Sequence, residues 1–321
     1  MIESIGIDNH IKKVVITGAT GMIGCSLIEE LLKYNIEVLA IVNPNSPRIS
    51  RIPKHNKVQV LACRLEDLEQ LFMNEKNMDH IYDAFFHLAW SGTIGDGRND
   101  MLLQNRNIKY TLDAVALAKR LSCKVFLGAG SQAEYGRVEE KINSNTPTNP
   151  ENGYGIAKLC AGQMSRIECE KLGIKHIWVR ILSVYGPCDG EATMIISGIR
   201  KMLRGEQPEF SKGEQQWDYL YCADAGRALY LAAEKGKDKS IYPIGSGKVR
   251  PLSEYIELME NAVKETKPDA RALIGALPYR DKQVMYLCAD IEELTKDTGF
   301  IPEVSFEEGI KKTVEWCKQV I

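Results

Sequence analysis

Short apolar runs alternate with helical patterns through the first half of the chain. The runs lie at residues 12–17, 36–42, 57–62, 83–89, 124–130 and 175–181. The segments between them carry apolar residues near helical spacing, as at 21–34 and 101–121. Apolar strands separated by helices predict a parallel sheet covered on both faces. We therefore expect a doubly wound α/β fold, in which ligands bind beyond the carboxyl ends of the strands.

The pattern changes after Arg180. Glycine and proline interrupt the second half, and its strand-like pieces are short and isolated. This indicates a smaller, mixed α/β C-terminal lobe. The last segment, 305–320, has Phe306, Ile310, Val314 and Cys317 at helical spacing and predicts a packed closing helix.

Charge and composition narrow the class of protein. The 321 residues carry a net charge of -2 with acids and bases interspersed, which argues against nucleic acid as a partner. No run of eighteen apolar residues and no basic-then-apolar leader occurs, so we expect a cytoplasmic protein with no membrane partner. The nine cysteines form no CxxC pair and the five histidines show no ligand spacing, so we expect neither disulfides nor a metal site.

Glycines 18, 21 and 24 follow the first strand in the segment TGATGMIG. A chain that turns this tightly from strand to helix needs glycine, and bare backbone N–H groups at a helix N-terminus suit a pyrophosphate. The plain alternative is a tight turn without a ligand. The strand, loop and helix context favours dinucleotide binding.

The end of the second strand bears on the choice of dinucleotide. Asn43 stands where a carboxylate that accepts the ribose 2′-hydroxyl is expected. Without that carboxylate a 2′-phosphate is not repelled, and Arg48 and Arg51 lie close enough in sequence to pair with one. We therefore expect NADP(H) to be preferred over NAD(H). The alternative is that both arginines are solvated loop residues.

Tyr154 and Lys158 are four residues apart in NGYGIAK, which places them on one face of a helix. An ammonium group beside a phenol is expected to lower the pKa of the phenol. On spacing alone, the plain reading is favoured, in which the pair merely covers apolar atoms of a surface helix. Ser131 follows the fifth strand at the same sheet edge, and a serine, a tyrosine and a lysine together suit hydride transfer at a carbinol or ketone.

The chain resembles the extended short-chain dehydrogenases/reductases that act on nucleotide sugars. The matching segments are 17–24, 87–89, 131–136, 154–158, 180–187, 217–224 and 244–247. The resemblance implies a Rossmann-type domain at 1–180, with a return of the chain around 218–246, and a nucleotide-sugar lobe at 181–217 and 247–321. It also implies Ser131, Tyr154 and Lys158 as the catalytic set. The cofactor-binding residues that we expect are Gly18, Thr20, Gly21, Met22, Ile23, Gly24, Asn43, Arg48, Arg51, Leu88, Ala89, Tyr154 and Lys158.

Departures from the family pattern narrow the reaction. The 4,6-dehydratases carry Asp and Glu directly after the catalytic hydroxyl, where this chain has Gln132 and Ala133. Dehydration is therefore not expected unless Glu134, offset by one residue, substitutes. Ser183 and Trp217 replace the usual Asn and Arg, which puts diphosphate contacts there in doubt. The substrate-binding residues that we expect are Trp90, Ser131, Gln132, Ser183 and Arg280; for Trp90 a core or surface role is an equal alternative.

The second half is similar to the CDP-paratose and CDP-abequose synthases, through segments 185–190, 245–257 and 285–294. The leading hypothesis is therefore NADPH-dependent reduction at carbon 4 of a 4-keto-6-deoxy or 3,6-dideoxy sugar nucleotide. An NAD-dependent nucleotide-sugar 4-epimerase is the alternative, and a non-catalytic cofactor-binding sensor is the rival from another class. The resemblance also implies a homodimer through two helices, one of them bearing Tyr154.

Overall fold

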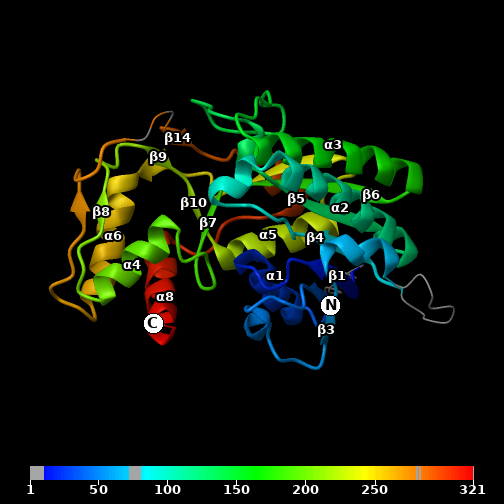
Figure 1. Ribbon diagram of the computed structural model, residues 1–321, viewed down its shortest axis with the longest axis horizontal. Coiled ribbons are helices and arrows are strands. Elements are labelled where there is room, and N and C mark those ends of the chain that lie inside the picture. The colour runs from blue at the N-terminus through cyan, green and yellow to red at the C-terminus, as the bar shows by residue number, and fades with distance from the viewer. Residues whose placement is uncertain (1–10, 72–80, 280, 282, 321) are drawn as a thin grey trace, which may run out of the picture.

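The computed structural model describes residues 11–71, 81–279, 281 and 283–320, which are built around one large parallel sheet (Figure 1). Within these residues seven strands pair in the order β11–β6–β5–β4–β1–β2–β3, all of them parallel. In chain order they are β1 (Lys13–Thr17), β2 (Glu37–Val42), β3 (Val58–Ala62), β4 (Ala84–His87), β5 (Val125–Ser131), β6 (Lys175–Ile181) and β11 (Ser240–Ile244). The predicted doubly wound α/β fold is confirmed. The winding reverses between β1 and β4, where this fold forms its binding crevice.

Two pairs of helices cover the sheet. Helices α1 (Met22–Lys33) and α5 (Cys222–Lys235) pack together on one face, and α2 (Met101–Arg120) and α3 (Gly153–Leu172) on the other (Figure 1). Alternate residues of a strand serve the two cores: Val14 and Ile16 lie in the core with α1 and α5, whereas Val15 lies in the core with α2. The strands are therefore apolar throughout because both of their faces are buried.

Capping groups fix the ends of α3, the helix that carries Tyr154. The Asn152 side chain accepts a hydrogen bond from the Gly155 backbone N–H at 2.8 Å, and the helix ends at Gly173, which has a φ of 68°. Helix α2 begins in the same way, with Asp100 accepting from the Leu103 N–H at 3.0 Å. The first turn of each helix is thus placed accurately at the carboxyl edge of the sheet.

A second lobe packs around its own apolar core, at the left of Figure 1. Its helices are α4 (Met194–Leu203), α6 (Leu252–Lys264) and α8 (Phe306–Gln319). Its short strands are β8 (Glu209–Phe210), β9 (Gln216–Trp217), β12 (Arg250–Pro251), β13 (Leu273–Ile274) and β14 (Tyr286–Leu287). The predicted closing helix is confirmed as α8, whose four apolar residues are buried.

The chain crosses between the lobes more than once. Strands β7 (Ser183–Tyr185) and β10 (Tyr219–Tyr221) pair in parallel beside the carboxyl edge of the large sheet. After β10 the chain forms α5 and then β11, which extends the large sheet beyond β6. Helix α7 (Glu292–Thr298) packs on α5 and β11. None of the helices in the described ranges is both long and apolar enough to cross a bilayer.

Candidate active site

The glycine loop between β1 and α1 is shaped by two close backbone approaches. Gly18 has a φ of 78°, and a Cβ there would lie 2.6 Å from the backbone nitrogen of Ala89. A Cβ at Gly24 would overlap the carbonyl oxygen of Gly18. Gly21, in contrast, caps α1 with only that carbonyl oxygen near its Cβ position, at 3.4 Å. Gly21 lines a cavity, and a side chain at this position would fill part of it. The loop therefore has room for a pyrophosphate against its backbone.

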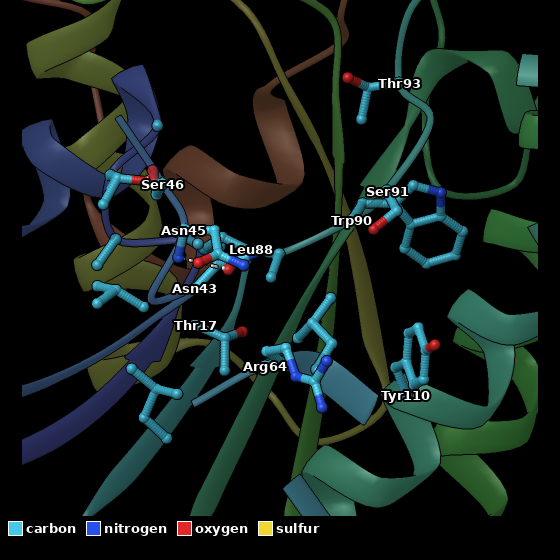
Figure 2. A pocket seen from close by; sticks show the side chains of 18 of the residues that line it. Thr17, Asn43, Asn45, Ser46, Arg64, Leu88, Trp90, Ser91, Thr93 and Tyr110 are labelled. Carbon is cyan, nitrogen blue, oxygen red and sulfur yellow. Dashed lines mark hydrogen bonds between the residues drawn. The ribbon is translucent and has the colours of Figure 1, made fainter. Parts of the chain in front are cut away.

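A cavity of about 820 Å³ lies at the carboxyl ends of β1 to β4, in the crevice that the winding predicts. The expected cofactor residues that line it are Gly18, Thr20, Gly21, Asn43, Arg48, Leu88 and Ala89, and Trp90 lines it too. Figure 2 shows Asn43 and Ser46 on one side of the cavity, Trp90 and Tyr110 on the other, and Arg64 between them. Met22, Ile23 and Gly24 belong to the first turn of α1 behind the cradle.

Arg51 does not join the other predicted cofactor residues. It is absent from the cavity wall, and its guanidinium donates a hydrogen bond to the carbonyl oxygen of Cys188 at 2.9 Å. The structure instead brings Arg64 to the cavity, where it forms ion pairs of 2.9 Å with Glu66 and with Asp67. Its place just after the third strand is a signal that could have identified it. Asn45, Ser46, Arg106 and Tyr110 are further lining residues that the sequence analysis missed.

Ser131 and Tyr154 meet behind Trp90, and neither of them, nor Lys158, is a lining residue of this cavity. Ser131 is the last residue of β5, and its side chain lies close enough to Tyr154, on the first turn of α3, to lower the pKa of the phenol. The Trp90 indole lies edge-on to the Tyr154 ring, with the ring centroids 6.1 Å apart, and donates a hydrogen bond to Gln104 at 2.9 Å. Trp90 thus separates the tyrosine from the cavity and is half-buried.

Lys158 lies on the same face of α3 as Tyr154 but is only 4% exposed. Its Nζ donates a hydrogen bond to the carbonyl oxygen of Ala129 at 2.5 Å and lies 3.8 Å from the centroid of the Trp90 ring. Burial lowers the pKa of Lys158 to about 7. Burial also raises the pKa of Tyr154, although the hydrogen bond to Ser131 and the charge of Arg98 oppose it. The pKa of Tyr154 is thus raised overall, not lowered as the spacing to Lys158 predicted, because burial outweighs the effects of Ser131 and Arg98.

Glu134 is a buried acceptor that holds the end of β5 and β6 together. Its carboxylate accepts from the Ser131 N–H at 2.8 Å, the Trp178 indole at 3.0 Å and the Arg180 guanidinium at 2.6 Å. The Glu134 and Arg180 side chains are 0% and 5% exposed. All of its partners are structural, so this carboxylate is not available to move a proton to a substrate. Gln132, next to Ser131, is half-buried at the start of the same short 3₁₀ turn.

The two departures from the family pattern in the second lobe contact each other. The Trp217 indole donates a hydrogen bond to the Ser183 hydroxyl at 2.9 Å, and both side chains are half-buried. The two replacements thus form one local unit, between β7 and β9. Arg280, the arginine expected at the diphosphate, lies outside the described residues. No three His, Cys, Asp or Glu side chains gather as metal ligands in the described parts of the chain.

Comparison with known proteins agrees with this geometry. Residues 14–245 match the NAD dependent epimerase/dehydratase family. A UDP-glucuronate 4-epimerase of Thermodesulfobacterium geofontis is 28% identical over 326 residues, 96% of either chain. The CDP-abequose synthase of Salmonella muenchen is 25% identical over 305 residues, 94% of this chain and 96% of that protein.

Solved structures agree as well. The UDP-glucose 4-epimerase of Thermotoga maritima, in complex with UDP-glucose, superposes with a TM-score of 0.81 at 26% identity over 96% of this chain and 99% of that one. A UDP-glucuronic acid 4-epimerase from Bacillus cereus, in complex with NAD, has a TM-score of 0.81 at 21% identity, covering 96% and 97% of the two chains. At that identity the second likeness concerns the fold alone.

A doubly wound parallel sheet with a glycine loop and a cavity at its carboxyl edge defines the Rossmann-type fold of an NAD(P)-dependent enzyme. The chain belongs to the NAD dependent epimerase/dehydratase family and is an enzyme of that family. The resemblance found in the sequence is confirmed.

Proposed function

We propose that this protein transfers hydride reversibly at carbon 4 of a sugar carried by a nucleoside diphosphate, and that it acts as a 4-epimerase. The observation that carries the proposal is the meeting of Ser131 and Tyr154 next to Trp90, which lines the cavity at the carboxyl edge of the sheet. The 4-epimerases among the similar proteins support this reading better than they support a net reductase.

The chain's own residues supply binding and proton transfer. When bound, a nicotinamide cofactor accepts and returns a hydride at carbon 4. Tyr154 takes the proton of the 4-hydroxyl group and gives it back, while the Ser131 hydroxyl holds the same sugar oxygen. The backbone at Gly18 and Gly21 binds the pyrophosphate. The Lys158 side chain, on the same helix as Tyr154, helps to hold the tyrosine in place.

Dehydration is disfavoured by the partners of Glu134. Removing a carbon-bound proton and expelling water both require a group that can carry a proton. Gln132 and Ala133 cannot do so, and the Glu134 carboxylate is occupied by Trp178, Arg180 and a backbone N–H.

A 4-keto reductase using NADPH is the second candidate, favoured by the adenosine end of the cavity. The residue directly after β2 is Asn43 and not a carboxylate. Its side chain accepts a hydrogen bond from the Asn45 N–H at 2.9 Å. Arg48 is exposed on the cavity wall, whereas Arg64 is already paired with Glu66. A 2′-phosphate could therefore pair with Arg48, and the CDP-abequose synthase is among the similar proteins.

One experiment separates these candidates. The purified protein is denatured, any released nicotinamide is identified, and the protein is assayed by NMR for interconversion of UDP-glucose with UDP-galactose and of UDP-glucuronate with UDP-galacturonate. A full equivalent of retained NAD⁺ with interconversion supports the epimerase. Substoichiometric cofactor, with consumption of NADPH on a 4-keto sugar nucleotide, supports the reductase. Retained cofactor with no turnover on any sugar nucleotide favours a binding protein instead.

The cofactor preference has its own test in Arg48→Met. If Arg48 binds a 2′-phosphate, the variant weakens NADPH binding at least tenfold and leaves NADH binding within twofold. Lys57→Met, which removes a cation from the opposite end of β3, serves as the control. Equal losses for both cofactors, or no loss for either, would count against NADP(H) preference.

We also propose a homodimer through α2 and α3. Their outer surface carries exposed apolar side chains on both helices: Leu102, Ile156, Met164 and Ile167. A water-exposed apolar strip along two adjacent helices favours association with another copy of the same surface.

A further inference from the structure

Trp178 is a large buried side chain between the two elements that carry Ser131 and Tyr154. It lies in β6, paired with Gly128 of β5, and is 2% exposed. Its indole leaves the sheet on the face that α3 covers, because it reaches the α3 backbone at Gly162. The indole is therefore enclosed by β5 on one side and by α3 on the other.

Three glycines make room for this ring. A Cβ at Gly128 or at Gly130 of β5 would overlap the indole. A Cβ at Gly162 of α3 would lie 2.7 Å from the indole carbon Cε2, which is too short for two carbon atoms that are not bonded. Strand and helix thus approach each other until only the Trp178 ring separates them. In a close-packed interior the ring therefore sets the distance between β5 and α3.

The polar edge of the indole reaches the turn that ends β5. The Trp178 Nε1–H donates a hydrogen bond to Glu134 Oε1 at 3.0 Å, and the same oxygen accepts from the Ser131 N–H at 2.8 Å. The other carboxylate oxygen accepts from the Arg180 guanidinium at 2.6 Å. Since Glu134 is 0% exposed, water does not compete for these bonds. The indole is therefore linked to the backbone of Ser131 through one shared acceptor.

The helix on the other side of the ring carries Tyr154, about two turns before Gly162. The first turn of α3 also contacts the end of β5, because a Cβ at Gly155 would overlap the carbonyl oxygen of Ala133. The Ala133 N–H in turn donates to the Ser131 hydroxyl at 3.2 Å. A hydroxyl and a phenol that serve one sugar oxygen must both lie within hydrogen-bond distance of it. A shift of about 1 Å between strand and helix can therefore cost about a hundredfold in rate.

We propose that Trp178 is a positioning residue for the reaction: its indole holds β5 and α3 at the separation that brings Ser131 and Tyr154 to the same sugar oxygen. This inference rests on the proposed function, because that function makes these two side chains act together. Trp178 is not a lining residue of the cavity and acts through the two elements that it separates. A side chain that only filled the core would affect stability and leave the reaction of the folded protein unchanged.

The direct test measures the titration of Tyr154 without any substrate. The ultraviolet absorption of tyrosinate is followed with pH in the wild type and in Trp178→Phe, and each is corrected by subtracting the matching protein that also carries Tyr154→Phe. Contact with Ser131 lowers the pKa of Tyr154, so Trp178→Phe should raise the midpoint as that contact is lost. Arg98 and Glu134, whose charges also act on the phenol, are the same in both proteins.

Two further variants separate spacing from stability. Gly162→Ala places a methyl group against the indole and should also raise the midpoint, so the inference stays testable if Trp178→Phe does not fold. Glu134→Gln keeps an oxygen for the indole and for the Ser131 N–H but loses a charge that raises the pKa of Tyr154. It should therefore lower the midpoint although it destabilises the protein. A raised midpoint in Glu134→Gln would assign the shifts to lost stability and overturn the inference.

Kinetics complete the test. Trp178→Phe should lower kcat for sugar interconversion about tenfold or more and leave KM within about twofold, because binding does not depend on the spacing of the serine and the tyrosine. Trp316→Phe, which changes a half-buried tryptophan of α8, should match the wild type in both measurements. An unchanged midpoint, or an unchanged kcat in an active enzyme, overturns the inference. A raised midpoint in a protein without turnover on any sugar nucleotide keeps the role of Trp178 in spacing and removes the proposed function.

Discussion

Lys158 is a base buried where its charge is disfavoured, and this has a measurable effect on stability. Its pKa is about 7 in the folded protein and about 10.4 in an unfolded chain. Between these values unfolding takes up a proton, so the cost of burying Lys158 is largest below pH 7 and fades toward pH 10. We predict that Lys158→Met gains stability over the wild type at pH 7, and that the gain is up to about 3 kcal/mol smaller at pH 9.5.

Urea unfolding at the two pH values measures this difference. Lys171→Met, which removes an exposed lysine at the end of α3, should change stability equally at both. If the effect of Lys158→Met on the free energy of unfolding does not depend on pH, the buried ammonium is stabilised by its surroundings and the prediction is contradicted.

Cys188 is the thiol that we expect to react first. It is half-buried, with a φ of 68°, and it lies beside the Cys25 thiol. The Cys25 thiol and the charge of Arg51 lower the pKa of Cys188 to about 7, while burial raises the pKa of the Cys123 and Cys169 thiols. Iodoacetamide should label Cys188 with a midpoint near neutral pH, and Cys25→Ala should slow this labelling at pH 7. Peptide mass spectrometry measures both, and faster labelling of Cys63 would contradict the prediction.

Residue roles were predictable from the sequence where they depend on local backbone. The positions of Gly18 and Gly21 follow from a turn between a strand and a helix. The charge state of Lys158 does not, because it depends on the Trp90 indole that covers it. Arg51 was misplaced for a similar reason: its hydrogen bond to Cys188 joins residues 137 positions apart.

Elements were predictable wherever both faces of a strand are buried. Strands β1 to β6 lie within a residue or two of their predicted bounds because their apolar runs are continuous. The two-residue strands β9 and β12 carry no such pattern. They form because they pair with each other, with Arg250 opposite Trp217. The sequence of one such short segment does not reveal the segment with which it pairs.

At the level of elements, Glu134 joins β5 to β6. Removing its charge would leave the Arg180 guanidinium buried without a counter-ion. We predict that Glu134→Gln lowers the free energy of unfolding by about 3–5 kcal/mol. Glu168→Gln, which breaks an exposed pair with Lys171, should cost less than about 1 kcal/mol. Denaturant unfolding compares the two, and equal costs would mean that water reaches the Arg180 pair.

At the scale of the whole molecule, the lobes divide the chemistry between them. The large sheet positions the cavity, and the end of β5 and the first turn of α3 place the proposed proton-transfer pair, Ser131 and Tyr154, near its Trp90 wall. The second lobe reaches the same edge through β7 and β10, which pair beside it. A substrate between the lobes would therefore be held by one lobe and oxidised or reduced by the other.

The α2–α3 surface carries the last prediction, which concerns assembly. Met164 and Ile167 on α3 are 42% and 49% exposed, and a charge at either position would be buried if two copies pack through this surface. We predict that the wild type is a dimer at micromolar concentration and that the double variant Met164→Glu, Ile167→Glu is a monomer. Ile301→Glu, at an exposed apolar position outside these helices, should stay dimeric. Sedimentation equilibrium measures all three, and a monomeric wild type, or a double variant that stays dimeric, would contradict assembly through this surface.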